Sequence, residues 1–151
     1  MKSKFHTHLH SHFPALSSQR VLVAVSGGVD SMVLVDMLRE YSEIVAVAHC
    51  NFQLRGQDSE QDEQLVDSYC TRHQLTCHIK RFDTKLFKQS TQMAARTLRY
   101  DWFEELCLSN DYNVVLIAHH ADDNIETLLM NIIRGTGIEG LTVSYATTDI
   151  E

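Results

Sequence analysis

The sequence has little proline, little glycine and no long apolar stretch. One proline and six glycines in 151 residues leave no linker-like or low-complexity segment, so the length fits a single domain. No apolar run is long enough for a membrane span or a secretory signal peptide, which excludes a membrane partner and indicates a cytoplasmic protein. Hydrophobic residues make up 44% of the chain, enough to fill a core.

The four cysteines lack the spacing of a metal or redox site. They are Cys50, Cys70, Cys77 and Cys107, and no two of them form a C-x-x-C pair. Zinc ribbons and dithiol redox centres need such pairs to bring two thiolates together. We therefore predict free, reduced and mostly buried thiols.

The sequence also lacks the positive charge that is typical of nucleic-acid-binding proteins. Its formal net charge is −7, whereas phosphates are held by lysine and arginine. If the chain acts on RNA, the contacts must come from a local patch or from surfaces outside this chain. Candidates for a patch are Lys80, Arg81, Lys85, Lys88, Arg96 and Arg134.

Residues 1–19 are predicted to be a flanking N-terminal helix or tail rich in histidine. On a helix, His6 and His10, and likewise His8 and His12, would share a face at a metal-capable i, i+4 spacing. The segment has no carboxylate or cysteine to complete a metal site. A solvated segment without a physiological metal is therefore the favoured interpretation.

Strands and helices are predicted to alternate along the rest of the chain. Strands are expected at residues 21–25, 44–48, 76–80 and 114–118. Amphipathic segments predict helices near residues 32–38, 60–73 and 91–108, with Leu65, Val66 and Tyr69 facing inward on the second. A further helix is predicted by apolar residues at i, i+3, i+4, i+7 and i+8, namely Ile125, Leu128, Leu129, Ile132 and Ile133.

This alternation predicts an α/β fold with an open, doubly wound parallel sheet and helices on both faces, similar to a Rossmann fold. In such sheets, ligands bind at the carboxyl ends of the strands. The two motifs described next follow predicted strands, so both are expected at that edge.

The first motif, Ser-Gly-Gly-Val-Asp-Ser, spans residues 26–31 between a strand and a helix. Its glycines allow a sharp turn and a close backbone approach to a ligand, and the helix N-terminus offers N–H groups to an anion. No lysine follows the glycines, so it is not the common NTPase loop. Asp30 would repel phosphate unless a divalent cation bridges the two.

The second motif follows the fourth predicted strand and opens the last predicted helix. His119, Asp123 and Glu126 are spaced i, i+4 and i+7, which would gather them at a helix start near His120. Carboxylates there would bind a metal ion or an ammonium group. For Asp122, the general preference of a first helical turn for acidic residues is a sufficient explanation.

The first motif resembles the signature loop of the N-type ATP pyrophosphatases, the PP-loop family. In that family the loop holds the pyrophosphate part of ATP, and the enzyme transfers AMP to a carbonyl oxygen. The resemblance implies ATP and Mg²⁺ as cofactors, with Asp30 as a catalytic residue and metal ligand. It assigns ATP binding to Ser26, Gly27, Gly28, Val29, Asp30 and Ser31.

Further segments make the chain similar to the tRNA(Ile)-lysidine synthase family. The matching segments are residues 49–52, 54–56, 59, 62–63, 95–96, 99–100 and the Arg-Gly-Thr-Gly turn at 134–137. Many members have a histidine where this chain has Phe52, so Phe52 is expected to have no polar role. Such ligases adenylate the ring carbonyl oxygen of the wobble cytidine in isoleucine tRNA, and the ε-amino group of free L-lysine then displaces AMP.

By this resemblance Arg99, Asp123 and Glu126 contact lysine, and His119 and Asp123 act in catalysis. The sequence does not choose between Asp123 and His119 as the acceptor of the amine proton. Family members continue into domains that grip tRNA. Residues 1–151 are therefore expected to be one N-terminal catalytic domain of a truncated chain, with weak affinity for isoleucine tRNA.

Three other functions stay open at this point. A tRNA thiolase of the same fold is one, although thiolases with an iron–sulfur cluster carry C-x-x-C pairs that are absent here. A small-molecule amide-forming synthetase is the second, and the His119–Asp123 motif argues against it. The third is an ATP-binding module that is inactive without tRNA-binding domains. The sequence does not indicate an oligomeric state.

Overall fold

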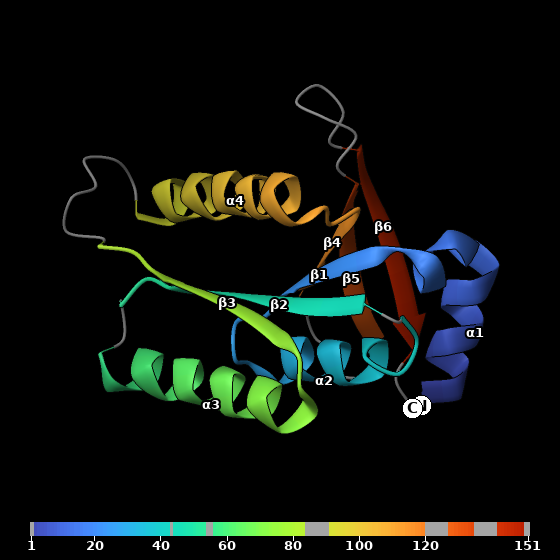
Figure 1. Cartoon of the computed structure of the whole chain (residues 1–151), viewed down its shortest axis with the longest axis horizontal. Coiled ribbons are helices and arrows are strands. Elements are labelled where there is room, and N and C mark those ends of the chain that lie inside the picture. The colour runs from blue at the N-terminus through green and yellow to red at the C-terminus, as the bar shows by residue number, and fades with distance from the viewer. Residues whose placement is uncertain are drawn as a thin grey trace.

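The computed structural model describes residues 2–42, 44–53, 56–83, 91–119, 127–134 and 142–149, with side chains at 4–42, 45–53, 56–83 and 93–118. The helices, shown in Figure 1, are α1 (Lys2–His12), a 3₁₀ helix (Pro14–Ser18), α2 (Val29–Leu38), α3 (Gln57–His73) and α4 (Thr91–Asn110). The strands are β1 (Arg20–Ala24), β2 (Ile44–Asn51), β3 (Thr76–Arg81), β4 (Val114–His119), β5 (Thr127–Arg134) and β6 (Thr142–Asp149). None of the described helices is long and apolar enough to cross a membrane.

The strands form one sheet in the order β3-β2-β1-β4-β5-β6. The pairs β3–β2, β2–β1 and β1–β4 are all parallel, and Val23 at the centre pairs with both Val47 and Leu116. The four predicted strands and the parallel α/β sheet are therefore confirmed. Because β1 has a neighbour on each side, the loop that follows it opens between the ends of β2 and β4.

Helices cover both faces of the parallel part of the sheet (Figure 1). Along β1, Val21 and Val23 face a cluster that contains residues of α1, α2 and α3. Leu22 and Ala24 face the opposite cluster, which α4 supplies with Trp102, Phe103 and Leu106. The continuous apolar sequence of β1 follows from this arrangement, because both faces of the strand are buried.

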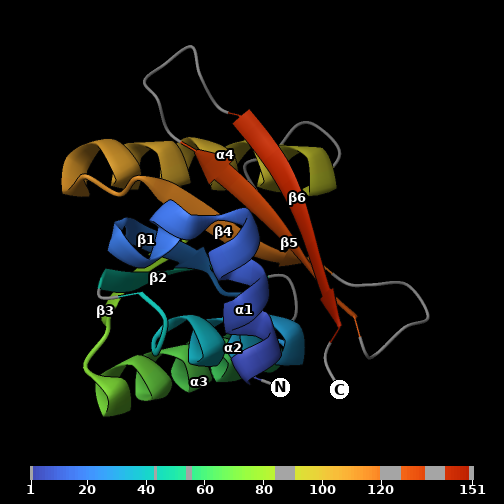
Figure 2. The ribbon, with the colours of Figure 1, turned by 90° about the vertical axis from the view of Figure 1, so that its right-hand side faces the viewer.

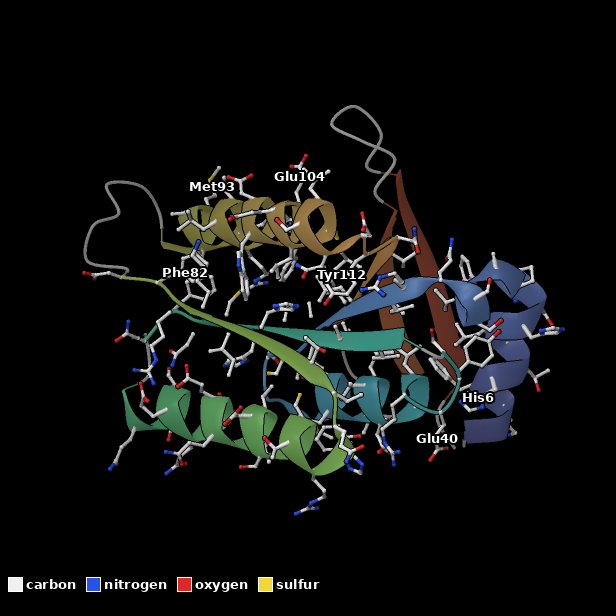
Figure 3. All side chains as sticks on the ribbon, viewed as in Figure 1. His6, Glu40, Phe82, Met93, Glu104 and Tyr112 are labelled. Carbon is white, nitrogen blue, oxygen red and sulfur yellow. The ribbon has the colours of Figure 1, made fainter. Side chains whose placement is uncertain are left out.

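The described part of the N-terminal segment contributes Phe5, Leu9 and Leu16 to the core, so the expectation of a solvated segment is wrong for these residues. On α1, Phe5 and Leu9 are one turn apart, and both are buried within the α2–α3 cluster. His6, labelled in Figure 3, has its Nε2 atom 2.9 Å from the Met37 carbonyl oxygen, and the rings of His8 and His12 stack on each other. Among the described side chains, no group of three or more histidine, cysteine or acidic residues is arranged to hold a metal ion.

The helix predicted from the apolar spacing at 125–133 is wrong. Residues 127–134 form β5, which pairs antiparallel with β4 from Val114↔Arg134 to His119↔Leu129 and also with β6 (Figure 2). A short apolar run fits a helix or a strand equally well by periodicity, and here it pairs with the open edge of β4. The sheet is therefore mixed, with four parallel and two antiparallel strands.

The three helices predicted near residues 32–38, 60–73 and 91–108 correspond to α2, α3 and α4, but the inward face predicted for α3 is only partly correct. Val66 is buried and Tyr69 is partly buried, but Leu65 is 49% exposed. The buried face of α3 consists of Glu63, Val66 and Cys70. An ionic residue thus occupies a core-facing position, and it is paired, as described below.

Candidate functional site

The segment from Ser26 to Ser31 turns between β1 and α2 and is closed by its own two serines. The Ser31 hydroxyl donates to the Gly28 carbonyl at 3.0 Å and accepts from the Ser26 backbone N–H at 3.2 Å. The two hydroxyl oxygens lie 3.2 Å apart, and the Gly28 N–H donates to the Ser26 hydroxyl. These hydrogen bonds tie the two ends of the turn to each other.

The position of Gly27 requires glycine for two reasons, its backbone conformation and the lack of space for a side chain. Its φ is +93°, a left-handed conformation that other residues rarely adopt. A β-carbon at Gly27 would lie 2.8 Å from the Asp62 Cβ on α3. The first turns of α3 therefore form a wall against this loop, and any side chain at Gly27 would push the two apart.

The loop leads directly into the N-terminus of α2. Gly28 is the N-cap, with extended backbone, and α2 begins at Val29. N–H groups in a first helical turn have no partner within the helix and attract anions. Val29 is 79% exposed, so this helix end is open to a ligand.

Three cavities meet at Ser26. One of about 260 Å³ follows the loop and the start of α2, and its lining includes Gly28, Asp30 and Ser31. A second of about 110 Å³ lies at the ends of β1, β2 and β4 and is mainly apolar, lined by Ala24, Ala48, Phe103 and Ile117 among others. A third of about 190 Å³ lies toward α3 and is polar, lined by His49, Asn51, Ser59, Asp62 and Arg99 among others.

Arg99 of α4 lies where the second and third cavities adjoin. Its guanidinium carbon is 5.7 Å from the centre of the Phe52 ring, which stacks on Phe82, the residue that follows β3. Cys50 lines the same two cavities, and burial raises the pKa of its thiol to about 12 despite the nearby positive charges. A guanidinium and a neutral thiol therefore face the space beside Ser26.

His49 connects β2 to the residue before the loop. It is buried, and its Nδ1 atom lies 2.7 Å from the Val25 carbonyl oxygen. No hydrogen-bond partner for its Nε2 atom is found among the described residues. Sequence reasoning gave His49 no role, because the partner of a strand histidine is set by tertiary packing.

Glu63 and Arg81 form an ion pair behind the third cavity. The Arg81 Nε donates to one Glu63 carboxylate oxygen at 3.0 Å, and a terminal guanidinium nitrogen donates to the other. The hydrogen bond from Arg81 lowers the pKa of Glu63, against the effect of burial. Arg81 also forms an ion pair with Glu60. The positive charge of Arg81, a candidate for RNA contact, is therefore balanced by two carboxylates of the protein itself.

The structure brings together part of the predicted site. The loop Ser26–Ser31 and Arg99 line the same set of cavities. His119 ends β4 beside them, and its side chain lies outside the described residues. Asp123 and Glu126 also lie outside the described residues. Residues 127–134, which would continue their predicted helix, form a strand, so the argument from helical spacing no longer supports that pair.

Comparison with known proteins agrees with this geometry. The family model of the PP-loop domain matches residues 1–150. The chain is 41% identical to the tRNA(Ile)-lysidine synthase of Chlorobaculum tepidum over 148 residues, covering 93% of this chain and 45% of that protein. It is 44% identical to that of Bacteroides thetaiotaomicron over 130 residues, covering 83% and 30%. The chain thus spans less than half the length of these relatives.

A solved structure supports the fold. The NH3-dependent NAD synthetase from Campylobacter jejuni, in complex with the nitrate ion, superposes with a TM-score of 0.57 over 76% of this chain and 53% of its own. The two sequences are 17% identical, so the likeness concerns the fold alone.

Proposed function

This chain belongs to the PP-loop domain family, and from that premise we propose that it is the ATP-binding catalytic domain of a tRNA(Ile)-lysidine synthase. The observation that carries the proposal is the loop from Ser26 to Ser31, which is closed by its own serines at the N-terminus of α2 and opens onto three adjoining cavities. The reaction joins lysine to the wobble cytidine of isoleucine tRNA and converts ATP to AMP and pyrophosphate.

The pyrophosphate part of ATP is assigned to the cavity along the loop. Backbone N–H groups of the first turn of α2 and the hydroxyls of Ser26 and Ser31 are hydrogen-bond donors of the kind that phosphate oxygens accept. Gly27 and Gly28 add no side chains, so the backbone can approach the phosphates closely. The positive end of the α2 dipole also attracts the negatively charged phosphates.

The adenosine part is assigned to the apolar cavity on the other side of Ser26. The lining of Ala24, Ala48 and Phe103 suits the faces of a purine ring. The small alanines at the ends of β1 and β2 leave this space open, whereas larger residues at the same positions would fill it. The α-phosphate then lies near Ser26, where the two cavities meet.

The residues present fit a magnesium ion bound together with ATP. Asp30 is partly exposed in the first turn of α2 and lines the phosphate cavity with two serine hydroxyls. Mg²⁺ is commonly held by one or two carboxylates, with phosphate oxygens and water completing its shell. Asp30 would hold the ion, which would neutralise charge on the phosphates.

Lysine and the tRNA base are assigned to the polar side of the site. Arg99 offers a forked donor to the α-carboxylate of lysine, and it lines both the cavity assigned to adenosine and the polar cavity. Asp123 and Glu126 are proposed for the ammonium groups, and His119 or Asp123 for the proton released as the amine attacks. The new C–N bond forms at the activated cytosine carbon as its bond to the AMP oxygen breaks.

Nucleotide titration tests the ATP site. Calorimetry with Mg²⁺ should show that the chain prefers ATP to AMP, because AMP lacks the pyrophosphate that the loop holds. Asp30→Asn should remove most of the Mg²⁺ dependence of ATP binding. Equal affinities for ATP and AMP would contradict the assignment of the loop, and an unchanged Mg²⁺ dependence would remove Asp30 from the metal role.

A further inference from the structure

We propose that His49 is a positioning residue that fixes the phosphate loop through the peptide group between Val25 and Ser26. This inference rests on the proposed function, because the loop is taken to hold pyrophosphate. His49 lines the polar cavity beside Ser26 but is not among the lining residues of the cavity assigned to pyrophosphate. It acts on one backbone carbonyl immediately before the loop.

The hydrogen bond to Val25 replaces the next step of the β1–β2 ladder. The two strands pair in parallel up to Ala24↔Ala48, and the Val25 N–H still donates to the Ala48 carbonyl at 2.9 Å. Beyond this point the chain leaves the sheet to form the loop. The imidazole of His49, the next residue of β2, then provides the donor for the Val25 carbonyl at 2.7 Å.

This contact also defines which ring nitrogen carries a proton. A carbonyl oxygen only accepts hydrogen bonds, so Nδ1 of His49 must be the donor. The imidazole therefore presents a fixed N–H to Val25. Glu63, which Arg81 holds in place, is near enough for His49 to contribute to its lowered pKa, of which the hydrogen bond from Arg81 is the main cause.

The hydrogen bond reaches the loop because a peptide group is planar and rigid. The Val25 carbonyl and the Ser26 N–H belong to the same peptide unit. His49 holds the carbonyl side of that unit, and the Ser31 hydroxyl accepts from its N–H side at 3.2 Å. Rotating the unit would break both contacts at once. Loss of the His49 donor therefore frees the start of the loop and misplaces Ser26.

The contact between Gly27 and α3 leaves the peptide group between Val25 and Ser26 little room to move. Gly27, one residue further on, already lies against Asp62 with no room for a β-carbon. A loop displaced toward α3 would collide with this wall, and one displaced away from it would enter the phosphate cavity. β2 and α3 thus act on the loop at two adjacent points, β2 through His49 and α3 through Asp62.

Two amide substitutions at His49 separate the role of Nδ1 from the bulk of the ring. Asparagine places its amide nitrogen near the position of Nδ1, and glutamine places it near Nε2. We expect His49→Asn to keep the preference for ATP over AMP within about threefold. His49→Gln should lower ATP affinity about tenfold, the range expected for a lost buried hydrogen bond, with a smaller loss for AMP, whose single phosphate is assigned only to the start of the loop.

The matched control is His78→Asn on the neighbouring strand, because asparagine does not reach the position of Nε2, the atom through which His78 bonds Tyr112. His78 is half-buried and bonds the Tyr112 hydroxyl at 2.8 Å, but it pairs with Ala48 and so faces the α4 side of the sheet. The control should lose a comparable hydrogen bond without changing the ATP-to-AMP ratio. A merely structural effect of His49 would weaken both nucleotides alike and lower the melting temperature in the same way as the control.

The outcomes are distinguishable. If the wild-type chain does not prefer ATP, the proposed function fails and this role fails with it. If the wild-type chain prefers ATP and His49→Gln keeps that preference unchanged, the positioning role alone is overturned. Should His49→Gln not fold, His49→Leu replaces it, because leucine fills the same buried space without a donor. A loss of ATP affinity in either variant that asparagine restores supports the proposal.

Discussion

Gly27 of the phosphate loop packs against Asp62 of α3 so closely that a β-carbon would lie 2.8 Å from the Asp62 Cβ. This contact connects two segments that are 35 residues apart in the sequence, so the loop shape depends on α3 as well as on its own residues. Real Cβ contacts do not occur at such a distance, so a substitution must move either the loop or the helix.

Gly27→Ala is therefore expected to weaken ATP binding by about tenfold or more, from left-handed strain of about 1–2 kcal/mol together with the contact to Asp62. Two controls separate these causes. Gly56→Ala has a left-handed φ of +55° in open space, so it carries strain without the contact. Gly28→Ala has a φ of −74° and only an ordinary neighbour, the Ser26 hydroxyl at 3.4 Å. Gly28→Ala places a methyl group beside the phosphate cavity, so it is expected to lower ATP affinity as well, but less than Gly27→Ala. An ATP titration in which Gly27→Ala loses no more affinity than Gly28→Ala would contradict the packing argument.

Glu63→Gln is expected to destabilise the protein at neutral pH by removing the charge that Arg81 pairs with. Because the folded protein lowers the pKa of Glu63, its stabilising effect is complete above the ordinary carboxyl pKa and is lost as the pH falls through the lower folded value. Melting temperatures of wild type and Glu63→Gln should thus differ at pH 7 and converge in acid. A difference that grows toward acid would have the wrong sign for this ion pair.

Cys50 is expected to resist alkylation although it lines the site. Burial raises the pKa of its thiol to about 12, so almost no thiolate is present at pH 8. Peptide mapping after iodoacetamide treatment should show modification of Cys50 about a hundredfold or more slower in the native chain than in denaturant, with a rate that rises with pH. Rapid native labelling that levels off below pH 9 would show that the thiol is not buried in this way.

Asp123→Asn is expected to abolish lysidine formation in the full-length protein while leaving ATP binding largely intact. The substitution keeps the shape of the side chain and removes the charge proposed for the ammonium group of lysine. Lysidine formation and ATP titration are measured on the same variant. A near-normal rate with normal lysine dependence would remove Asp123 from the lysine site and make a different substrate for the same loop the better account.

The parts of the fold that the sequence predicted correctly are those determined by local pattern. β1 is apolar on both faces because it lies at the centre of a parallel sheet, and this gives the unbroken run at 21–25. The loop is equally local, since both serines that close it lie within six residues. In these segments the side-chain pattern and the tertiary environment agree.

The parts that it did not predict depend on distant residues. The run at 127–134 suits a helix or a strand, and pairing with the edge of β4 decides between them. Glu63 occupies the buried face of α3 because Arg81, on another element, neutralises it. His49 has its partner 24 residues earlier in the chain. Contacts of this kind have no signature in a local sequence window.

The central claim is that this PP-loop domain activates the wobble cytidine of isoleucine tRNA for attack by lysine. The most direct measurement is mass analysis of that nucleoside after isoleucine tRNA has been incubated with full-length protein, ATP, Mg²⁺ and lysine. The account predicts a mass gain of one lysine less one water at the wobble position, dependent on both ATP and lysine. An unmodified cytidine in the presence of active ATP turnover, or a different added group, would contradict it.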